Sequence, residues 1–188
     1  MTSPDTITEQ LIYSGVPRRY LTAEPRPDLI GGAYIYGGVG VGKTYAACGA
    51  MRAYIQSSIV KVETFEYYDG KSVRFVNVPQ WFALLRSTYD TAGQSEYEMF
   101  DKYASCGLLV LDDLGKGSKS EWAAERLYML LDKRYADKLP TIITSNYTVS
   151  KVASMLSTDA ETMQSIASRI VGSCKGVEMN GADRRVGA

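Results

Sequence analysis

The chain has 188 residues and carries 21 acidic and 21 basic side chains, so its formal net charge is zero. This length is typical of a single domain, and a content of 45% apolar and 22% charged residues is typical of a soluble globular protein. No stretch approaches the ~18 consecutive apolar residues of a membrane span. The first ten residues lack the basic start and apolar core of a signal peptide. We therefore expect a cytoplasmic protein without a membrane partner.

The residue types argue against several classes of protein. A chain that wraps duplex DNA by charge alone is normally more basic, so any nucleic acid would be bound through a local patch or by an oligomer. The sequence contains no histidine, which excludes a histidine-based triad, metal site or proton shuttle. Its three cysteines show no metal-ligand spacing and are typical of buried side chains in a reducing compartment.

Short apolar strands alternate with helices along most of the chain. Residues 1–30 contain four prolines and are predicted to be irregular, apart from a possible short helix at 6–13. We expect strands at 33–36, 106–111, 141–144 and 176–180, and helices at 43–57, 96–104, 121–136, 149–157, 160–171 and from Pro79 onward. The β-rich runs 59–68 and 73–78 flank Asp69-Gly70, which predicts an antiparallel hairpin turning at that dipeptide.

This alternation predicts an α/β fold with a parallel sheet covered on both faces. Ligands of such sheets bind beyond the carboxyl ends of the strands. A glycine-rich loop, the pair Asp112-Asp113 and Asn146 each follow a predicted strand. We therefore expect these three features to form one site.

The glycine-rich loop reads GGVGVGKT and lies between a predicted strand and a predicted helix. This is the context of a phosphate-binding loop, in which backbone N–H groups and the helix N-terminus hold phosphate oxygens. Lys43 would reach the β- and γ-phosphates and Thr44 would ligate Mg²⁺. The alternative, a turn with an incidental Lys-Thr, is disfavoured by the flanking elements. The predicted nucleotide-binding residues here are Gly37, Gly38, Val39, Gly40, Val41, Gly42, Lys43, Thr44 and Tyr45.

Two consecutive acids follow the buried run at 108–111. Asp112 is predicted to hold the Mg²⁺ together with Thr44, and Asp113 to orient or deprotonate the attacking water. Beside a phosphate loop, this interpretation is favoured over a solvated turn. Asn146 could hold the water or the γ-phosphate, or cap the following helix.

Catalysis of this kind often needs a second cation, which a neighbouring subunit can supply. The candidates in the sequence are Arg126, Arg134 and Arg169, although the usual arginine is a solvated or ion-paired surface residue.

The motifs together resemble those of the AAA+ ATPases, specifically the bacterial helicase-loader group (DnaC- and DnaI-like) and the IstB-like transposition helpers. The resemblance extends over nearly the whole chain from Gly15. It rests on GVPRRY (15–20), YIYGGVGVGKT (34–44), VRFVNVPQWFALLR (73–86), LLVLDDLG (108–115), RYADKLPTIITSN (134–146) and IASRIVG (166–172). The phosphate loop alone is common to many families, but DDLG, PTIITSN and SRIVG in this order are far more specific.

The resemblance implies an AAA+ core with a central parallel five-stranded sheet flanked by helices and no C-terminal lid. It divides the chain into an N-terminal segment (1–30), whose Val16 and Pro17 lie along the adenine, and an ATPase domain (31–188). It further implies Mg²⁺-dependent hydrolysis of ATP to ADP at lysine, acid and asparagine positions that match Lys43, Asp112, Asp113 and Asn146.

The resemblance also implies how such chains assemble and what they bind. ATP would lie between the subunits of a homo-oligomer, with Arg169 entering the neighbour's site. Arg185 falls where IstB-like chains carry a C-terminal arginine. The implied partners are single-stranded DNA and a replicative helicase, and the helix at 96–104 would line the DNA path with Tyr97, Lys102 and Tyr103.

Some features depart from the loader pattern. Asp113 stands where many AAA+ proteins have glutamate, and only about thirty residues precede the first strand, where loaders usually have a helicase-gripping domain. An IstB-like helper that acts on duplex DNA with a transposase is therefore an alternative. A P-loop kinase of a small metabolite and an ATP-dependent scaffold without useful turnover are further alternatives.

Overall fold

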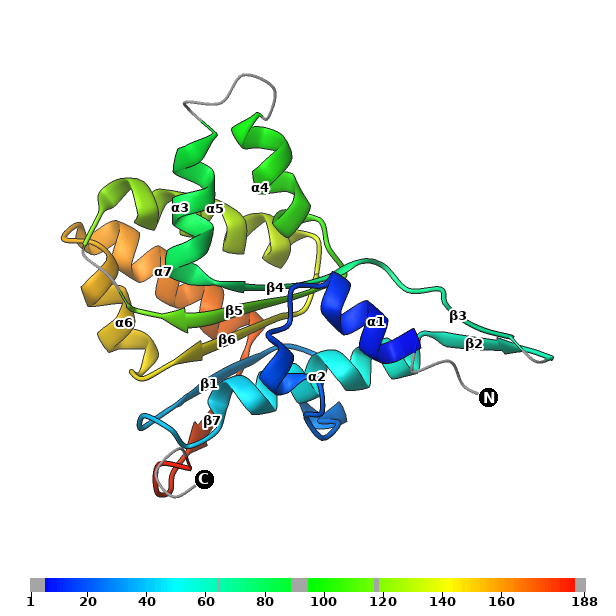
Figure 1. Cartoon of the computed structure of the whole chain (residues 1–188). Coiled ribbons are helices and arrows are strands. Elements are labelled where there is room, and N and C mark those ends of the chain that lie inside the picture. The colour runs from blue at the N-terminus through cyan, green and yellow to red at the C-terminus, as the bar shows by residue number, and fades with distance from the viewer. Residues whose placement is uncertain (1–5, 64, 89–94, 117–118, 185–188) are drawn as a thin grey trace.

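The computed structural model describes residues 6–63, 65–88, 95–116 and 119–184. Five parallel strands form a central sheet between two groups of helices, as Figure 1 shows, and their order is β4-β5-β6-β1-β7. The strands are β1 (Ala33–Gly37), β4 (Val73–Asn77), β5 (Leu108–Leu114), β6 (Thr141–Ser145) and β7 (Lys175–Met179). This arrangement confirms the predicted fold class.

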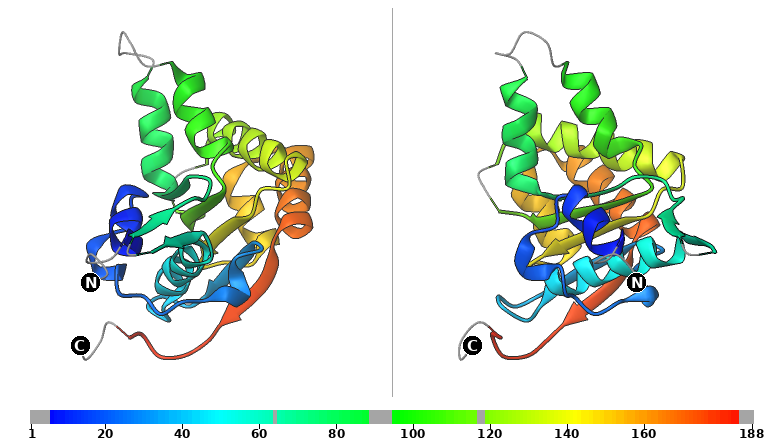
Figure 2. Two further views of the ribbon diagram at one scale, coloured as in Figure 1. Left: turned by 90° about the vertical axis from the view of Figure 1, so that its right-hand side faces the viewer. Right: turned by 45° about the vertical axis from the view of Figure 1, so that its right-hand side comes forward.

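The helices cover both faces of the sheet. One face carries α1 (Thr6–Tyr13) and α2 (Lys43–Ser57), together with the 3-10 turns η1 (Arg18–Tyr20) and η2 (Pro27–Leu29). The other face carries α3 (Val78–Ser87), α4 (Glu96–Ala104), α5 (Glu121–Ala136), α6 (Val149–Leu156) and α7 (Ala160–Ser173). In Figure 2, α3 and α4 stand out as a pair beyond the edge strand β4. Within the described ranges, no helix is both long and apolar enough to cross a membrane.

The core consists of two clusters, one on each face of the sheet. Successive side chains of a strand point to opposite faces, so Tyr34 joins the cluster under α5 and α7, whereas Ile35 joins the cluster under α2. Leu109 and Val110 of β5 divide in the same way. All four are almost completely buried, which explains why these short strands are apolar throughout rather than alternating.

The N-terminal residues 6–30 pack against this core. Leu11 of α1 and Leu29 of η2 are fully buried beside α2, and the backbone N–H of Phe75 donates to the Ser14 carbonyl at 2.8 Å. The short helix predicted at 6–13 is present with the expected bounds. The segment thus holds the middle of β4 and contributes to the same core as α2.

The prediction of a hairpin that turns at Asp69-Gly70 is wrong. Strand β2 (Ile59–Val62) pairs with β3 (Phe65–Tyr68), and Val73–Asn77 joins the main sheet beside β5 instead. The left-handed residue at the hairpin is Glu63, with φ +52°, and Gly70 does not adopt a positive φ. An Asp-Gly hairpin turn requires a positive φ at the glycine, so this dipeptide only connects the hairpin to the sheet.

Candidate functional site

The phosphate loop connects β1 to α2 at the carboxyl edge of the sheet. Gly42 is the N-cap of α2, with a left-handed φ of +100°, and no side chain caps the helix there. The first N–H groups of α2 are therefore directed at the loop, where an anion can accept them. Lys43 is buried, and its Nζ donates to the carbonyl oxygen of Gly37 at 2.9 Å. The predicted loop residues thus form a cradle for phosphate groups.

Thr44 and Asp112 meet at the mouth of this loop. Thr44 Oγ1 donates to Asp112 Oδ1 at 2.8 Å, and Thr144 Oγ1 donates to the same oxygen at 2.7 Å. Burial raises the pKa of the Asp112 carboxyl, and the hydrogen bond from Thr144 opposes that rise. A hydroxyl and a carboxylate beside a phosphate cradle are the oxygen donors that Mg²⁺ prefers, so this pair fits the predicted metal site.

Asp113 lies in a bulge of β5. Leu111 and Leu114 pair with Ile143 and Ser145 of β6, so Asp112 and Asp113 together lie opposite Thr144 alone. Asp113 has a φ of +63°, and its backbone N–H donates to Thr144 Oγ1 at 2.9 Å. Thr144 therefore bridges the two acids, accepting from one and donating to the other. Bulges commonly re-aim side chains near active sites.

Among the described residues, two polar side chains contact the Asp113 carboxylate. Lys116 Nζ lies 2.7 Å from Oδ2, and Asn77 Nδ2, at the end of β4, lies 3.4 Å from the same oxygen. The sequence motifs did not identify Thr144, Lys116 and Asn77 as parts of the site. The signal for Thr144 and Asn77 is a polar residue near the carboxyl end of a short strand.

Asn146 directly follows β6, which lies between β5 and β1. Its side chain is half-buried. Tyr34 Oη donates to the Tyr147 carbonyl at 2.8 Å, which fixes the backbone just after Asn146. Asn146 is thus at the same sheet edge as the acids and the phosphate loop, and its role in holding water or phosphate stays a prediction.

A pocket of about 230 Å³ opens between η1 and the phosphate loop. Its lining includes Arg19 and Tyr20 of η1, Tyr45 of α2, and Arg184, besides loop residues. Val16 does not line it, because its side chain is buried in the core beside α2. Pro17 is the N-cap of η1, so the predicted adenine-side motif lies just before the pocket. The residues that line the pocket, Arg19 and Tyr20, come three positions after Val16 and Pro17.

The chain returns to the phosphate loop after β7. The N–H of Arg184 donates to the Gly40 carbonyl at 3.1 Å, and its guanidinium lies against Gly42. The Asp183 carboxylate covers the α-carbon of Gly40 so closely that a Cβ there would lie 1.7 Å from Oδ1. Among the described residues, Arg184 is the C-terminal arginine at the site, whereas the predicted Arg185 lies outside them.

The three candidate arginines have different surroundings. Arg134 is 1% exposed and donates to the carbonyls of Cys106 and Pro140 at 2.8 and 2.7 Å, so it is a structural residue and its candidacy was wrong. Arg126 pairs with Glu96 at 2.6 Å. Arg169 pairs with Asp132 at 2.6 Å, on the face of the sheet opposite α2. Arg169 is therefore not part of the phosphate site of its own chain.

The predicted DNA-contacting residues of α4 are not equivalent. Tyr97 is 75% exposed, but Tyr103 is only 6% exposed and its ring packs edge-on against Trp81, with centroids 6.4 Å apart. The ammonium of Lys102 lies over the Tyr103 ring at 5.8 Å. Tyr103 is a core residue because its ring is buried against α3, so the prediction that it stacks on bases is wrong.

The chain is similar to bacterial replication proteins. Over 117 residues it is 29% identical to the replicative helicase loader DnaI of Bacillus subtilis (62% of this chain, 33% of DnaI). Over 87 residues it is 25% identical to the replicative helicase loader DnaC of Escherichia coli K12 (46% and 36%). These matches span about a third of the length of each relative. A structure of a putative primosome component from Streptococcus pyogenes, at 19% identity, aligns with 96% of this chain and 98% of its own, with a TM-score of 0.69, which shows a shared fold.

The family assignment rests on a longer match. The family model described as "IstB-like ATP binding protein" matches residues 32–187, which include the phosphate loop, both acids and the five strands of the central sheet. The match covers most of the chain, which therefore belongs to the family of IstB-like ATP-binding proteins and has an AAA+ P-loop core.

Proposed function

We propose that this protein is a Mg²⁺-dependent ATPase that works as an oligomer on single-stranded DNA and assists the loading of a replicative helicase. The observation that carries the enzymatic part is the contact of Thr44 and Asp112 at 2.8 Å, beside the uncapped N-terminus of α2. Phosphates bound by the loop would lie next to an oxygen pair suited to a divalent cation.

ATP would enter the pocket between η1 and the loop, with its base on the side of Arg19 and Tyr20, which closely follow the predicted Val16 and Pro17. The N–H groups of α2 and the ammonium of Lys43 would hold the phosphates. Mg²⁺, held by Thr44 and Asp112, would neutralise charge on the β- and γ-phosphates. Asp113 would orient the attacking water and accept its proton, with Asn146 positioned to hold that water or the γ-phosphate.

A second cation would come from another copy of the chain. Arg169 lies on α7 and is partly exposed; it pairs with Asp132, and its guanidinium lies over the ring of Tyr135 at 5.0 Å. An arginine held rigid on the surface, away from its own phosphate site, suits a role in a neighbour's site, where such a residue can raise the rate about 10³–10⁵-fold. This supports a homo-oligomer with ATP between subunits.

The replication role rests on the similarity to DnaI and DnaC, which are named as replicative helicase loaders. The cytoplasmic location predicted from the sequence is part of this proposal. The family name favours a second candidate, a transposition helper that acts on duplex DNA with a transposase. A clear preference for duplex over single-stranded DNA would select the second candidate.

The test is ATP turnover against protein concentration, with and without single-stranded DNA. We expect turnover per subunit to rise with concentration and with DNA, and Arg169→Ala to reduce it at least 100-fold. Arg26→Ala is the matched control, because it removes a surface pair with Asp28 of similar length, 2.7 Å, away from α7.

Mixing two inactive variants tests the shared site directly. Lys43→Ala disables a subunit's own phosphate loop but leaves its Arg169, whereas Arg169→Ala has the opposite defect. A mixture that recovers activity supports sites shared between subunits. Turnover linear in protein concentration, indifferent to DNA and to Arg169, would instead favour the kinase-like alternative, and ATP binding without turnover would favour the scaffold.

A further inference from the structure

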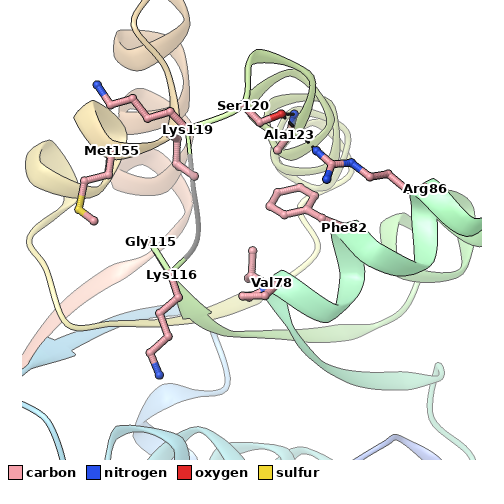
Figure 3. Close-up of a pocket in the computed structure, with 11 residues that line it drawn as sticks. Val78, Phe82, Arg86, Gly115, Lys116, Lys119, Ser120, Ala123 and Met155 are labelled. Carbon is pink, nitrogen blue, oxygen red and sulfur yellow. Dashed lines mark hydrogen bonds between the residues drawn. The ribbon is translucent and has the colours of Figure 1, made fainter.

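A second cavity lies at the same edge of the sheet, beside the acids but apart from the phosphate loop. Its volume is about 390 Å³, and it is lined by α3, by Gly115, Lys116 and Lys119, by the start of α5 and by the end of α6 (Figure 3). Val78 and Phe82 of α3, Ala123 of α5 and Met155 of α6 contribute an apolar wall to it. A space of this size with an aromatic wall can hold one nucleotide-sized group.

The rim of this cavity is cationic. Arg86, Lys116 and Lys119 line it, and none of the described residues in its lining is acidic. The opposite sign gathers in another cavity, between α5 and α7, whose lining includes Glu121, Glu125, Asp159 and Glu161. The linings of these two cavities thus differ in sign, and the cavity of Figure 3 is the kind of local patch through which a neutral chain can bind a polyanion.

Lys116 connects this cavity to the candidate catalytic acid. The stem of Lys116 lines the cavity, while its ammonium points away from it in Figure 3 and lies 2.7 Å from Asp113 Oδ2. The side chain is exposed and flexible, so its ammonium can move to another anion at the cavity mouth. One cation is thus within reach of both the acid and a cavity ligand.

We propose that this cavity binds a nucleotide unit of single-stranded DNA and that Lys116 then exchanges Asp113 for a DNA phosphate. The proposal rests on the ATPase function proposed above. The apolar wall that contains Phe82 suits an unstacked base, and the cationic side chains of the rim suit the backbone. Duplex DNA keeps its bases stacked and paired, so it cannot present a base to this wall.

The exchange couples DNA binding to hydrolysis. While Lys116 is paired with Asp113, its ammonium lies 2.7 Å from Oδ2 and competes with the attacking water for that oxygen. When a phosphate draws Lys116 away, Oδ2 becomes available to the attacking water. Lys116 is therefore a positioning residue that keeps hydrolysis slow until DNA is present.

Three variants test the coupling. Lys116→Met keeps the apolar stem but removes the charge, and we expect it to hydrolyse ATP several-fold faster than wild type without DNA and to gain little from DNA. Lys116→Arg keeps the ion pair and should restore the slow basal rate. Lys133→Ala, which removes an exposed cation paired with Asp137 on the far end of α5, should leave both rates unchanged.

The DNA site is tested by the binding of a labelled oligothymidylate at several salt concentrations. Lys119→Ala should weaken binding and reduce the slope of log K against log salt by about 0.7, the value for one lost phosphate contact on a single strand. Lys133→Ala should change neither. An unchanged slope and affinity for Lys119→Ala, or equally strong competition by polyglutamate, would overturn the assignment of the cavity to DNA.

The outcomes separate this proposal from the one on which it rests. Wild-type protein that hydrolyses ATP without stimulation by DNA would overturn the coupling and leave the ATPase standing. A Lys116→Met variant with the wild-type basal rate and full stimulation would do the same. Absence of hydrolysis in the wild type under all conditions would overturn both.

Discussion

Replacing Thr144 with valine tests the geometry of the candidate site most directly. Thr144 Oγ1 accepts from the backbone N–H of Asp113 at 2.9 Å and donates to Asp112 Oδ1 at 2.7 Å. Valine has nearly the same shape but can do neither. Because Thr144 is completely buried, no water replaces the lost partners without rearrangement, and the bulge that carries both acids loses its central contact.

The expected loss of stability follows from these two contacts. A buried N–H without an acceptor costs about 1–3 kcal/mol, and a hydrogen bond to a carboxylate contributes a similar amount. We expect Thr144→Val to lower the free energy of unfolding by about 3 kcal/mol, which for a chain of this size lowers Tm by roughly 6–12 °C. Thr144→Ser keeps the hydroxyl and loses one methyl, at a cost of about 0.8 kcal/mol.

The deficit of the valine variant should also depend on pH. Burial raises the pKa of Asp112 above its ordinary value, and removing the Thr144 hydrogen bond raises it further. A carboxyl whose pKa is higher in the folded state favours folding when protonated, so stability falls as pH rises through the window between its unfolded and folded pKa. The valine variant should therefore lose more stability at pH 8 than below that window.

Urea unfolding of wild type, Thr144→Val and Thr144→Ser at several pH values measures these differences, and ATP turnover follows the chemistry. The valine variant should lose nearly all turnover, because both acids are displaced, whereas the serine variant should retain most of it. A valine variant as stable and as active as the serine variant would refute the bridging role of Thr144.

Two further predictions concern buried charges. Asp112→Asn should abolish turnover yet raise Tm at pH 8, because the amide oxygen still accepts from Thr44 and Thr144 while the penalty for burying an ionised carboxyl is removed. Thermal melts should show that this gain in Tm shrinks toward acidic pH. A fall in Tm at pH 8 would contradict the prediction. Arg134→Met should destabilise the protein by about 3–5 kcal/mol, since the carbonyls of Cys106 and Pro140 lose their donor and a buried network is broken. An unchanged unfolding midpoint in urea would show that Arg134 has no structural role.

The helices and strands were predictable because their signals are local. Ser95 and Glu98 form a capping box, which sets the start of α4 at residue 96, and Gly42 ends the phosphate loop where α2 begins. Apolar runs bounded by polar residues marked β1 and β6. The prediction that failed was the pairing partner of Val73–Asn77, since strand pairing depends on residues that are distant in the sequence. The N–H of Phe75 bonds to Ser14, and Val73 pairs with Leu108.

The same distinction applies to single residues. The sequence shows that position 103 is a tyrosine and position 134 an arginine, and both types are common at DNA and phosphate sites. Their roles are fixed by burial, which follows from how α4 and α5 pack together: the Tyr103 ring packs against Trp81, and Arg134 donates to the Tyr103 carbonyl at 3.0 Å. The residue type in a motif can therefore suggest a binding function for a side chain that is in fact buried in the core.

The acid pair shows most clearly where the sequence stops being sufficient. Asp112 and Asp113 are adjacent in a strand, and in a regular strand adjacent side chains point to opposite faces of the sheet. The bulge against Thr144 and the left-handed backbone of Asp113 break that alternation, and they bring the second carboxylate within reach of Asn77 and Lys116. A glutamate at this position would have one more methylene group, so its carboxylate could reach the attacking water from more backbone directions. The shorter aspartate depends on the bulge for its direction, so the register of β5 against β6, rather than the DD motif itself, determines where the predicted base can act.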